Sequence, residues 1–208
     1  MTICLVTDRR RRSPIEQASE AAEAGVDLIQ IRERDLDAGA LSALVAGVVG
    51  AVRGSATRVV VNDRVDVAIA CGADGVHLRG DSMPAVRVRA MTPEGFLIGC
   101  SVHGPAGAIA AAGAADYLLA GTVFPTASKP GKTGFLGLQG LAAVVKAVSV
   151  PVLAIGGMSV AVAGDIASAG AQGLAAISLF ANPDRPIKDV VRQIRDRFNI
   201  GGDFPPQR

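Results

Sequence analysis

Tryptophan is absent from this chain of 208 residues, and aromatic residues make up only 3% of it. Proteins that bind single-stranded nucleic acids usually stack the bases on aromatic side chains, so this scarcity argues against such a site. The formal net charge of +2 is too small to indicate a polyanionic partner. The one basic run, DRRRRS at 8–13, is interpreted as a solvated loop, although one of its arginines could lean towards an anionic substrate.

Cysteine is also scarce, with Cys4, Cys71 and Cys100 widely spaced and in apolar surroundings. An odd count without a CxxC motif argues against a disulfide scaffold and against a thiolate metal site, so we expect free thiols in a reducing compartment. No apolar run reaches the roughly 18 residues of a membrane span, and the opening TICLVTD is too short for a signal peptide. The sequence therefore predicts a cytoplasmic protein without a membrane partner.

Apolar residues make up 50% of the chain, and small and aliphatic side chains supply most of them. One pattern recurs: a small-residue helix ends at glycine, a polar turn follows, and a continuous apolar run comes next. Glycine at a helix end fits a left-handed cap, and a continuous apolar run is typical of a parallel strand covered on both faces. The four copies are EAGVDLIQIR (23–32), ACGADGVHLR (70–79), AAGAADYLLAG (111–121) and SAGAQGLAAIS (168–178).

Extending this pattern along the chain predicts eight strands that alternate with eight helices. The strands are expected at 2–7, 27–32, 58–62, 75–78, 96–101, 116–120, 151–155 and 173–177. The helices are expected at 14–24, 38–53, 64–71, 84–91, 105–113, 138–148, 159–169 and 186–198. Strict alternation over this length predicts an α/β fold of the (β/α)8 TIM barrel type, with one domain at 1–200 and a flexible tail at 201–208. A doubly wound open sheet is the alternative, but no glycine-rich dinucleotide motif follows the first strand.

In such a barrel the chemistry lies at the carboxyl ends of the strands, where polar residues gather in this sequence. The glycine pair Gly156–Gly157 follows the seventh strand, and Ile177–Ser178 ends the eighth. Glycine lets backbone approach an anion closely, and a short helix expected after Ser178 would direct its N–H groups to the same place. We interpret these residues as a phosphate site, although a glycine pair is often only a tight turn.

The longest loop, at 121–137, follows the sixth strand and is rich in hydroxyl groups and lysine. A loop of this kind often closes over a site, and Thr126, Ser128 and Lys129 could hold a phosphate or diphosphate. A solvated loop is the alternative.

Side chains alternate along a strand, so Gln30 and Arg32 lie on the same side of the second strand. Arg32 could clamp a carboxylate or phosphate, or it could be neutralised by Asp8, Glu33 or Asp63 in a structural ion pair.

Each of the two histidines lies at a strand end. His103 follows the fifth strand, where an imidazole could transfer protons near neutral pH, although a solvated loop histidine has the same signature. His77 lies within GVHLR, and we interpret it as a packed or supporting residue.

Several motifs in order resemble the family that contains thiamin phosphate synthase and thiazole tautomerase, both (β/α)8 barrels. These motifs are QIRER, VVNDRVDVAIACGADGVHL, IGCSVHG, DYLLAGTVFPTASKPG and PVLAIGGM. The resemblance covers nearly the whole chain and implies a role in thiamin biosynthesis with a small phosphorylated thiazole as substrate.

The synthase branch couples hydroxymethylpyrimidine diphosphate to thiazole phosphate with Mg²⁺. The resemblance places the family's Asn-Asp pair at Asn62 and Asp63 and keeps Thr126 and Lys129. It places Ser82 where the synthase has a second metal aspartate, with Asp81 one position early. Since Mg²⁺ binding relies on carboxylate oxygens, this difference weakens the case for synthase activity.

The tautomerase branch aromatises a carboxythiazole phosphate by proton transfer without a metal. Its Gly-x-Ser-Val-His motif falls on His103, so the resemblance implies that His103 is the catalytic acid or base, with Arg32 as an anion partner.

We therefore expect a thiazole tautomerase without a cofactor. The alternative is a Mg²⁺-dependent synthase that uses Asp63 and Asp81. A non-catalytic barrel that binds thiazole or thiamin phosphate is the second alternative. The sequence does not determine the oligomeric state, and self-association is one option. The remaining expected substrate contacts are Gln30, Asn62, Ser101, Thr122, Gly156, Gly157, Ile177 and Ser178.

Overall fold

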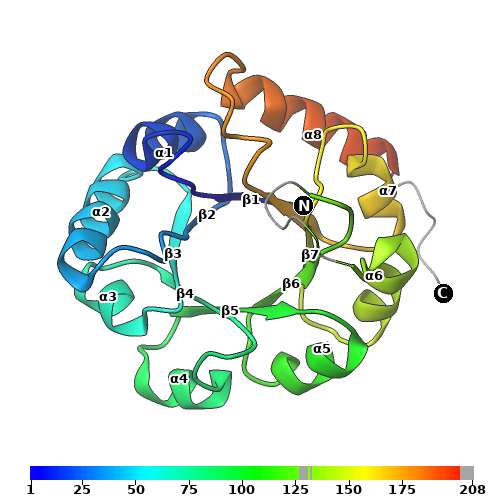
Figure 1. Ribbon diagram of the computed structural model, residues 1–208, viewed down its shortest axis with the longest axis horizontal. Coiled ribbons are helices and arrows are strands. Elements are labelled where there is room, and N and C mark those ends of the chain that lie inside the picture. Colours follow the sequence, from blue (N-terminus) through cyan, green and yellow to red (C-terminus); the bar gives the residue numbers. More distant parts are fainter. Residues whose placement is uncertain (127–130, 132, 202–208) are drawn as a thin grey trace.

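A computed structural model describes residues 1–126, 131 and 133–201 of the chain. Eight parallel strands form a closed barrel in sequence order, and the helices surround it (Figure 1). The first strand pairs with both the second and the eighth, which excludes the open sheet. The predicted (β/α)8 barrel is confirmed.

The elements agree closely with the predicted ranges. The strands are β1 (Thr2–Val6), β2 (Leu28–Ile31), β3 (Arg58–Asn62), β4 (Gly75–Leu78), β5 (Leu97–Val102), β6 (Tyr117–Gly121), β7 (Val152–Ile155) and β8 (Gly173–Ala176). The helices are α1 (Pro14–Glu23), α2 (Ala38–Ala51), α3 (Val65–Ala70), α4 (Ala85–Met91), α5 (Pro105–Ala112), α6 (Gly137–Lys146), α7 (Ala163–Ser168) and α8 (Ile187–Gly201). Apart from Gly201, the expected tail at 201–208 lies outside the described residues.

Two expectations about helix ends were wrong. Helix α7 begins at Ala163 and not at 159, because a turn closed by the N–H of Ala163 and the carbonyl of Val160 (3.3 Å) precedes it. The left-handed glycine cap holds for Gly25, Gly72 and Gly170, but Gly113 has φ −68°. The connection after Gly113 is one residue longer than the other three, so the chain turns there without the left-handed conformation.

The apolar residues form two cores. The larger lies between the barrel and its helices, which explains why the strands read as continuous apolar runs. The smaller consists of inward-facing side chains: Cys4, Val6, Leu28, Val60, Tyr117, Leu119, Leu153 and Ala175. These side chains pack against one another inside the barrel.

The polar turn of the repeated sequence pattern has a structural role that the sequence did not reveal. In each copy the residue just before an even-numbered strand accepts a hydrogen bond from a backbone N–H near the start of the preceding strand. Each distance is 2.7 Å, and the pairs are Asp27 with Ile3, Asp74 with Val59, Asp116 with Ile98 and Gln172 with Val152. We call these contacts the strand clamps.

Removal of one strand clamp is expected to destabilise the barrel. Asp74→Ala leaves the Val59 N–H without its acceptor, and loss of a partly buried hydrogen bond of this kind costs about 1–3 kcal/mol. Urea unfolding measures the loss. Asp74→Asn keeps an acceptor oxygen and should retain most of the stability; equal losses in the two variants would contradict the clamp.

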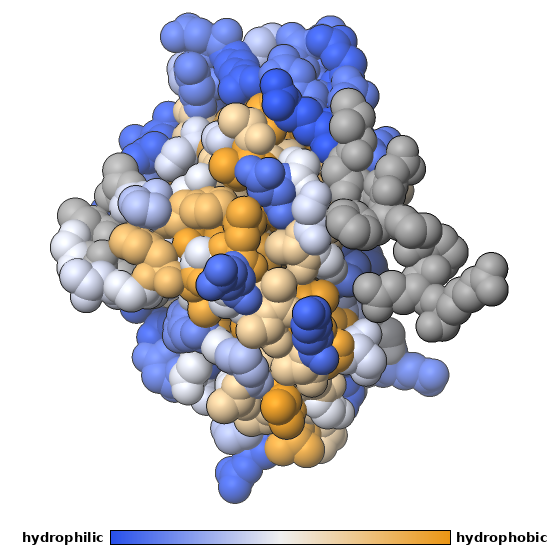
Figure 2. All heavy atoms as spheres, turned by 90° about the vertical axis from the view of Figure 1, so that its right-hand side faces the viewer, coloured by the Kyte–Doolittle hydropathy of each residue, from blue (hydrophilic) through white to orange (hydrophobic). Residues whose placement is uncertain are grey.

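The flank that bears α6 and α7 is shown in Figure 2, where apolar side chains gather near the middle with single hydrophilic ones among them. Within the described residues, no helix is both long and apolar enough to cross a membrane. The expected self-association stays a prediction.

Candidate active site

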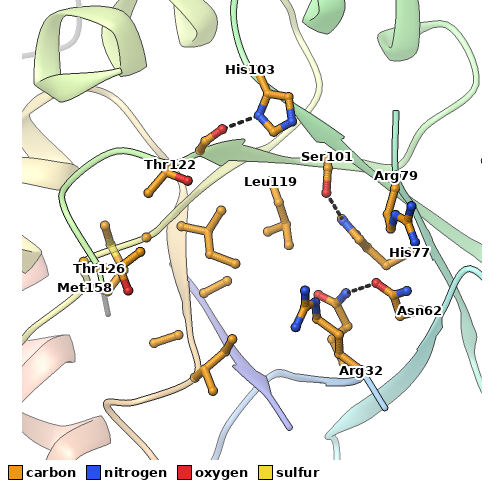
Figure 3. A pocket seen from close by; sticks show the side chains of 18 of the residues that line it. Arg32, Asn62, His77, Arg79, Ser101, His103, Leu119, Thr122, Thr126 and Met158 are labelled. Atoms are coloured by element: carbon orange, nitrogen blue, oxygen red, sulfur yellow. Dashed lines mark hydrogen bonds between the residues drawn. The ribbon is translucent and has the colours of Figure 1, made fainter. Parts of the chain in front are cut away.

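A cavity of about 590 Å³ opens at the carboxyl end of the barrel. It brings together residues that are far apart in sequence and that were predicted from strand ends, from the 121–137 loop or from the family resemblance (Figure 3). Those that line it are Gln30, Arg32, Asn62, Asp81, Ser101, His103, Thr122, Thr126, Gly156, Gly157, Ile177 and Ser178. Ser128 and Lys129 lie outside the described residues, and the substrate contacts themselves stay predictions.

The Gly156–Gly157 bend is required by its neighbours as well as by its backbone. Both residues have positive φ, at 101° and 68°. A Cβ at Gly156 would lie 2.4 Å from Thr122 Cγ2, and one at Gly157 would lie 2.6 Å from the carbonyl oxygen of Pro125. The bend therefore packs directly against the start of the loop that follows β6.

This side of the cavity also offers backbone donors. Within the described residues, the N–H groups of Gly157 and Ser178 donate no hydrogen bond to the protein. The short helix expected after Ser178 was wrong: residues 178–180 form a turn, and α8 begins only at Ile187. Unpaired backbone N–H groups at a cavity wall are suited to bind an anion without a helix.

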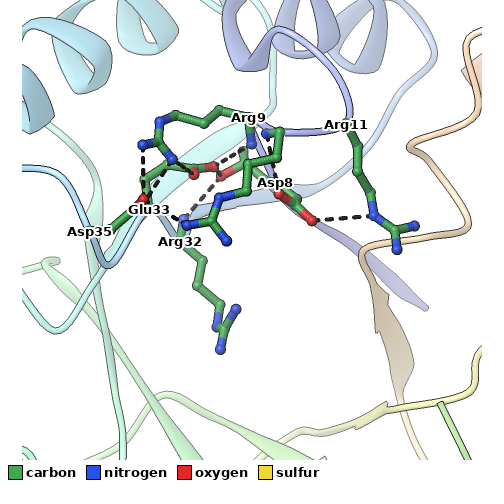
Figure 4. A network of polar contacts seen from close by, with 8 residues as sticks. Asp8, Arg9, Arg11, Arg32, Glu33 and Asp35 are labelled. Atoms are coloured by element: carbon green, nitrogen blue, oxygen red, sulfur yellow. Dashed lines mark hydrogen bonds and ion pairs between the residues drawn. The ribbon is translucent and has the colours of Figure 1, made fainter. Parts of the chain in front are cut away.

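Arg32 extends into the cavity rather than into a structural ion pair. Glu33, the nearest acidic neighbour in sequence, accepts hydrogen bonds from the Thr7 hydroxyl (2.7 Å) and the Arg9 backbone (3.0 Å). Figure 4 shows the Arg32 guanidinium pointing away from this network, while its backbone N–H donates to Thr7 (3.0 Å). In the described part of the chain, the Arg32 guanidinium forms no ion pair with Asp8, Glu33 or Asp63.

The four-arginine run at 9–12 has acidic partners throughout. Arg9 and Arg10 contact Asp35, and the other two pair with Asp8 and Glu20. None of the four lines the cavity, which supports a loop that is structural and not a ligand contact.

Two further arginines that were not proposed from the sequence, Arg34 and Arg79, line the same end of the cavity as Arg32. Burial first, and then the positive charges of Arg34 and Arg79, lower the pKa of Arg32. An anion bound here would relieve this repulsion, so the three residues, which we call the arginine cluster, are suited to bind an anion.

The carboxylates that a magnesium ion would need are already engaged. Asp63 accepts a hydrogen bond from the Ser82 hydroxyl and lies 3.7 Å from Arg79 (Oδ2 to Nη1). Arg79 also pairs with Asp81, which lines the cavity, whereas Asp63 does not. Among the described residues, no group of three or more His, Cys, Asp or Glu side chains could hold a metal. The residues present do not fit a magnesium ion held by Asp63 and Asp81.

Gln30 lines the cavity and has a buried acceptor atom without a partner. Its side-chain Nε2 donates to Asn62 Oδ1 (3.1 Å), and the residue is only 2% exposed. Its Oε1 atom is buried without a hydrogen-bond partner. A buried amide oxygen is costly to leave unpaired, so a ligand with an N–H donor would complete this site.

His103 lies on the same rim as the Gly156–Gly157 bend, as predicted, and at the exposed mouth of the cavity. Its Nδ1 donates to the carbonyl oxygen of Gly121 (Figure 3). This hydrogen bond orients the ring and leaves Nε2 able to accept or deliver a proton. The geometry permits the predicted acid–base role, which stays a prediction.

His77 is fully buried and uncharged. Burial first, and then the positive charge of Arg32, lower its pKa from 6.5 to about 3. The ring bonds to Ser101 Oγ through Nε2 (2.8 Å) and to the Tyr117 hydroxyl through Nδ1 (3.2 Å). The expected supporting role of His77 is consistent with these contacts.

The depressed pKa of His77 predicts a pH-dependent stability. Below about pH 6.5 the unfolded chain binds a proton at this histidine, and the folded protein does not until about pH 3. Stability should therefore fall as the pH falls, with about 2 kcal/mol lost through this residue between pH 7 and pH 5. Urea unfolding of His77→Gln should show that much less pH dependence, whereas the control variant His103→Gln should keep the buried-histidine contribution. Equal pH dependence in the native protein and in His77→Gln would contradict the assignment.

Comparisons with known proteins agree with this fold and show the family. A family model described as thiamine monophosphate synthase matches residues 3–180. A putative thiamine-phosphate synthase of Geobacter sulfurreducens is 40% identical over 88% of each chain, and a thiamine-phosphate synthase of Methanoculleus marisnigri is 39% identical over 93% of each. The solved thiamine phosphate pyrophosphorylase of Pyrococcus furiosus superposes with a TM-score of 0.85, at 32% identity over 96% of each chain. The chain therefore belongs to the thiamine monophosphate synthase family of (β/α)8 barrels.

Proposed function

We propose that this protein is a thiamine-phosphate synthase that joins hydroxymethylpyrimidine diphosphate to thiazole phosphate and releases pyrophosphate. The relatives reported above are named for the synthase, at 39–40% identity over most of the chain. They support this alternative over the tautomerase that the Gly-x-Ser-Val-His motif had favoured. A role in thiamin biosynthesis, which both readings shared, is supported by the family as a whole.

The unpaired Oε1 of Gln30 is the observation that carries the proposal. An aminopyrimidine has N–H groups that could donate to this buried oxygen, whereas the non-aromatic carboxythiazole phosphate of the tautomerase has an imine nitrogen and no N–H. Gln30 is in β2, Arg32 directly follows that strand, and both line the cavity, so a pyrimidine bonded to Gln30 would extend its diphosphate towards the arginine cluster. This arrangement favours the two-part pyrimidine substrate.

The other substrate would bind at a second place in the cavity. The free N–H groups of Gly157 and Ser178 lie across the cavity from the arginine cluster and would take the thiazole phosphate. In the reaction the bond between the pyrimidine methylene and the diphosphate oxygen breaks, and its electron pair leaves with pyrophosphate. The thiazole nitrogen then supplies the electron pair of the new C–N bond. Arg32, Arg34 and Arg79 would stabilise the charge that develops on the departing pyrophosphate.

A paired assay tests the proposal. The purified protein is given both synthase substrates, in one arm with Mg²⁺ and in one with a chelator, and pyrophosphate and thiamin phosphate are measured. In a separate arm it is given the non-aromatic carboxythiazole phosphate. Thiamin phosphate formation is expected. Aromatisation without coupling would instead support the tautomerase, and tight binding without either product would support the non-catalytic barrel.

The variant His103→Gln separates the two activities further. The coupling reaction needs no proton transfer at the site of His103, so its kcat should fall less than about tenfold in this variant. Tautomerisation relies on an acid or base and should be abolished if His103 supplies it. If kcat for coupling falls more than a hundredfold while the unfolding midpoint is unchanged, His103 takes part in coupling, and this prediction is wrong.

A further inference from the structure

A chain of three polar side chains crosses the inside of the barrel below the cavity. Tyr117 on β6, His77 on β4 and Ser101 on β5 are joined by the two hydrogen bonds of His77. Figure 3 shows the bond between His77 and Ser101. His77 is 1% exposed and Tyr117 is 7% exposed, so the lower part of this chain is in the packed interior. His77 and Ser101 both line the cavity, and Ser101, which is half-buried, is the end of the chain that a ligand can reach.

Glycine on the middle strand makes the chain possible. His77 pairs in register with Gly99, and Gly99 pairs with Tyr117, so the three residues lie at one level of β4, β5 and β6. A Cβ at Gly99 would lie 2.1 Å from Tyr117 Cζ and 2.6 Å from His77 Nδ1. The missing side chain lets His77 reach Tyr117 across the intervening strand, and Ser101, two residues further along β5, faces the same interior.

The hydrogen-bond partners determine which nitrogen of His77 carries the proton. The Tyr117 hydroxyl has one hydrogen, and His77 Nδ1 is its only acceptor among the described residues. When Tyr117 donates to Nδ1, the ring proton must be on Nε2, which then donates to Ser101 Oγ. The opposite tautomer would leave the buried Tyr117 hydroxyl without an acceptor, which is disfavoured.

We propose that Tyr117 and His77 are positioning residues that fix Ser101 as a hydrogen-bond donor to the ligand. Because Nε2–H occupies a lone pair of Ser101 Oγ, the hydroxyl hydrogen of Ser101 is free to point into the cavity. It would donate to an acceptor atom of the bound substrate, namely a pyrimidine ring nitrogen or a diphosphate oxygen. The ligand's identity rests on the synthase activity proposed above, but the orientation of Ser101 does not.

NMR of protein labelled with ¹⁵N at histidine tests the orientation directly. The chain has only two histidines, so His103→Gln assigns the spectrum. The native protein should show His77 as the neutral Nε2–H tautomer, with no protonation between pH 5 and pH 8. In Tyr117→Phe the Nε2–H form should lose population to the Nδ1–H form, and in Ser101→Ala it should persist because Tyr117 still donates. A native Nδ1–H tautomer, or an unchanged tautomer in Tyr117→Phe, would overturn the proposal.

Calorimetry with hydroxymethylpyrimidine diphosphate supplies the functional measurement. Ser101→Ala should weaken binding about tenfold, because one donor is lost, and Tyr117→Phe should weaken it less. Tyr117→Phe binding as tightly as the native protein while its tautomer shifts would overturn the proposed link to the ligand. If the native protein binds none of this probe, the synthase proposal fails, while the tautomer measurement still decides the orientation of Ser101.

Discussion

Replacing Arg32 by alanine is expected to lower kcat/KM for pyrophosphate release by about a hundredfold or more. Arg32 forms no ion pair in the described part of the chain, so its charge is available to the diphosphate. Charge-assisted hydrogen bonds contribute about 1.5–3 kcal/mol each, and a bidentate contact makes two of them. Because 1.4 kcal/mol corresponds to a tenfold change, loss of both bonds gives the expected size of effect. Steady-state assays of coupling measure it.

Two control variants separate the contact made by Arg32 from the effect of its charge alone. Arg32→Lys keeps the charge but loses the planar fork, so it should recover only part of the activity. Arg87→Ala removes an equal charge from an exposed position on α4 and should leave kcat/KM within about twofold, as for a distant surface site. Similar losses in Arg87→Ala and Arg32→Ala would show that net charge, and not the contact at Arg32, controls the rate.

The largest expected effect on stability comes from Gly173→Ala, at the seam where β8 meets β1. A Cβ there would lie 1.9 Å from the carbonyl oxygen of Thr2 and 2.8 Å from Leu153 Cδ2. The closest atom belongs to the backbone of the neighbouring strand, so this steric clash can be relieved only if β1 and β8 move apart. Overpacking usually costs 1–3 kcal/mol, and we expect a loss of about 3 kcal/mol or more in urea unfolding.

Gly50→Ala is the matched control for this prediction. Gly50 lies on the exposed side of α2, and a Cβ there meets no atom within 4 Å. Alanine in a helix is favoured over glycine, so this variant should gain about 0.5–1 kcal/mol. A Gly173→Ala protein as stable as the native one would mean that the barrel seam is looser than these contacts indicate.

The sequence predicted the fold well because the barrel repeats one local signal. Each copy of the pattern ends a helix at glycine and begins a buried strand, and the parallel arrangement follows from continuous apolar runs. What the sequence missed depends on distant contacts. The turn before α7 and the backbone conformation of Gly113 are determined by loop length and packing. Asp27 and Asp74 have the sequence signature of ordinary turn residues, so their hydrogen bonds to the preceding strand were not predicted.

The site was predicted to the extent that position in a barrel implies function. The rule that strand ends face the cavity predicted that Arg32, His103 and the Gly156–Gly157 bend line it, which they do, while their roles stay predictions. It did not select Arg34 and Arg79, because a charged residue after a strand has the same signature in a solvated loop. The chain from Tyr117 to Ser101 was also missed, since it depends on the register of three strands.

The strand clamps divide the barrel into four consecutive two-strand modules. Each clamp ties β1 to β2, β3 to β4, β5 to β6 or β7 to β8. New chain ends introduced before β3, β5 or β7 would leave the two partners of every clamp in one continuous module. A break between the two partners of a clamp would instead place them on separate segments, which the clamp would then have to hold together. Circular permutation and fragment complementation of this barrel should therefore succeed at every second loop.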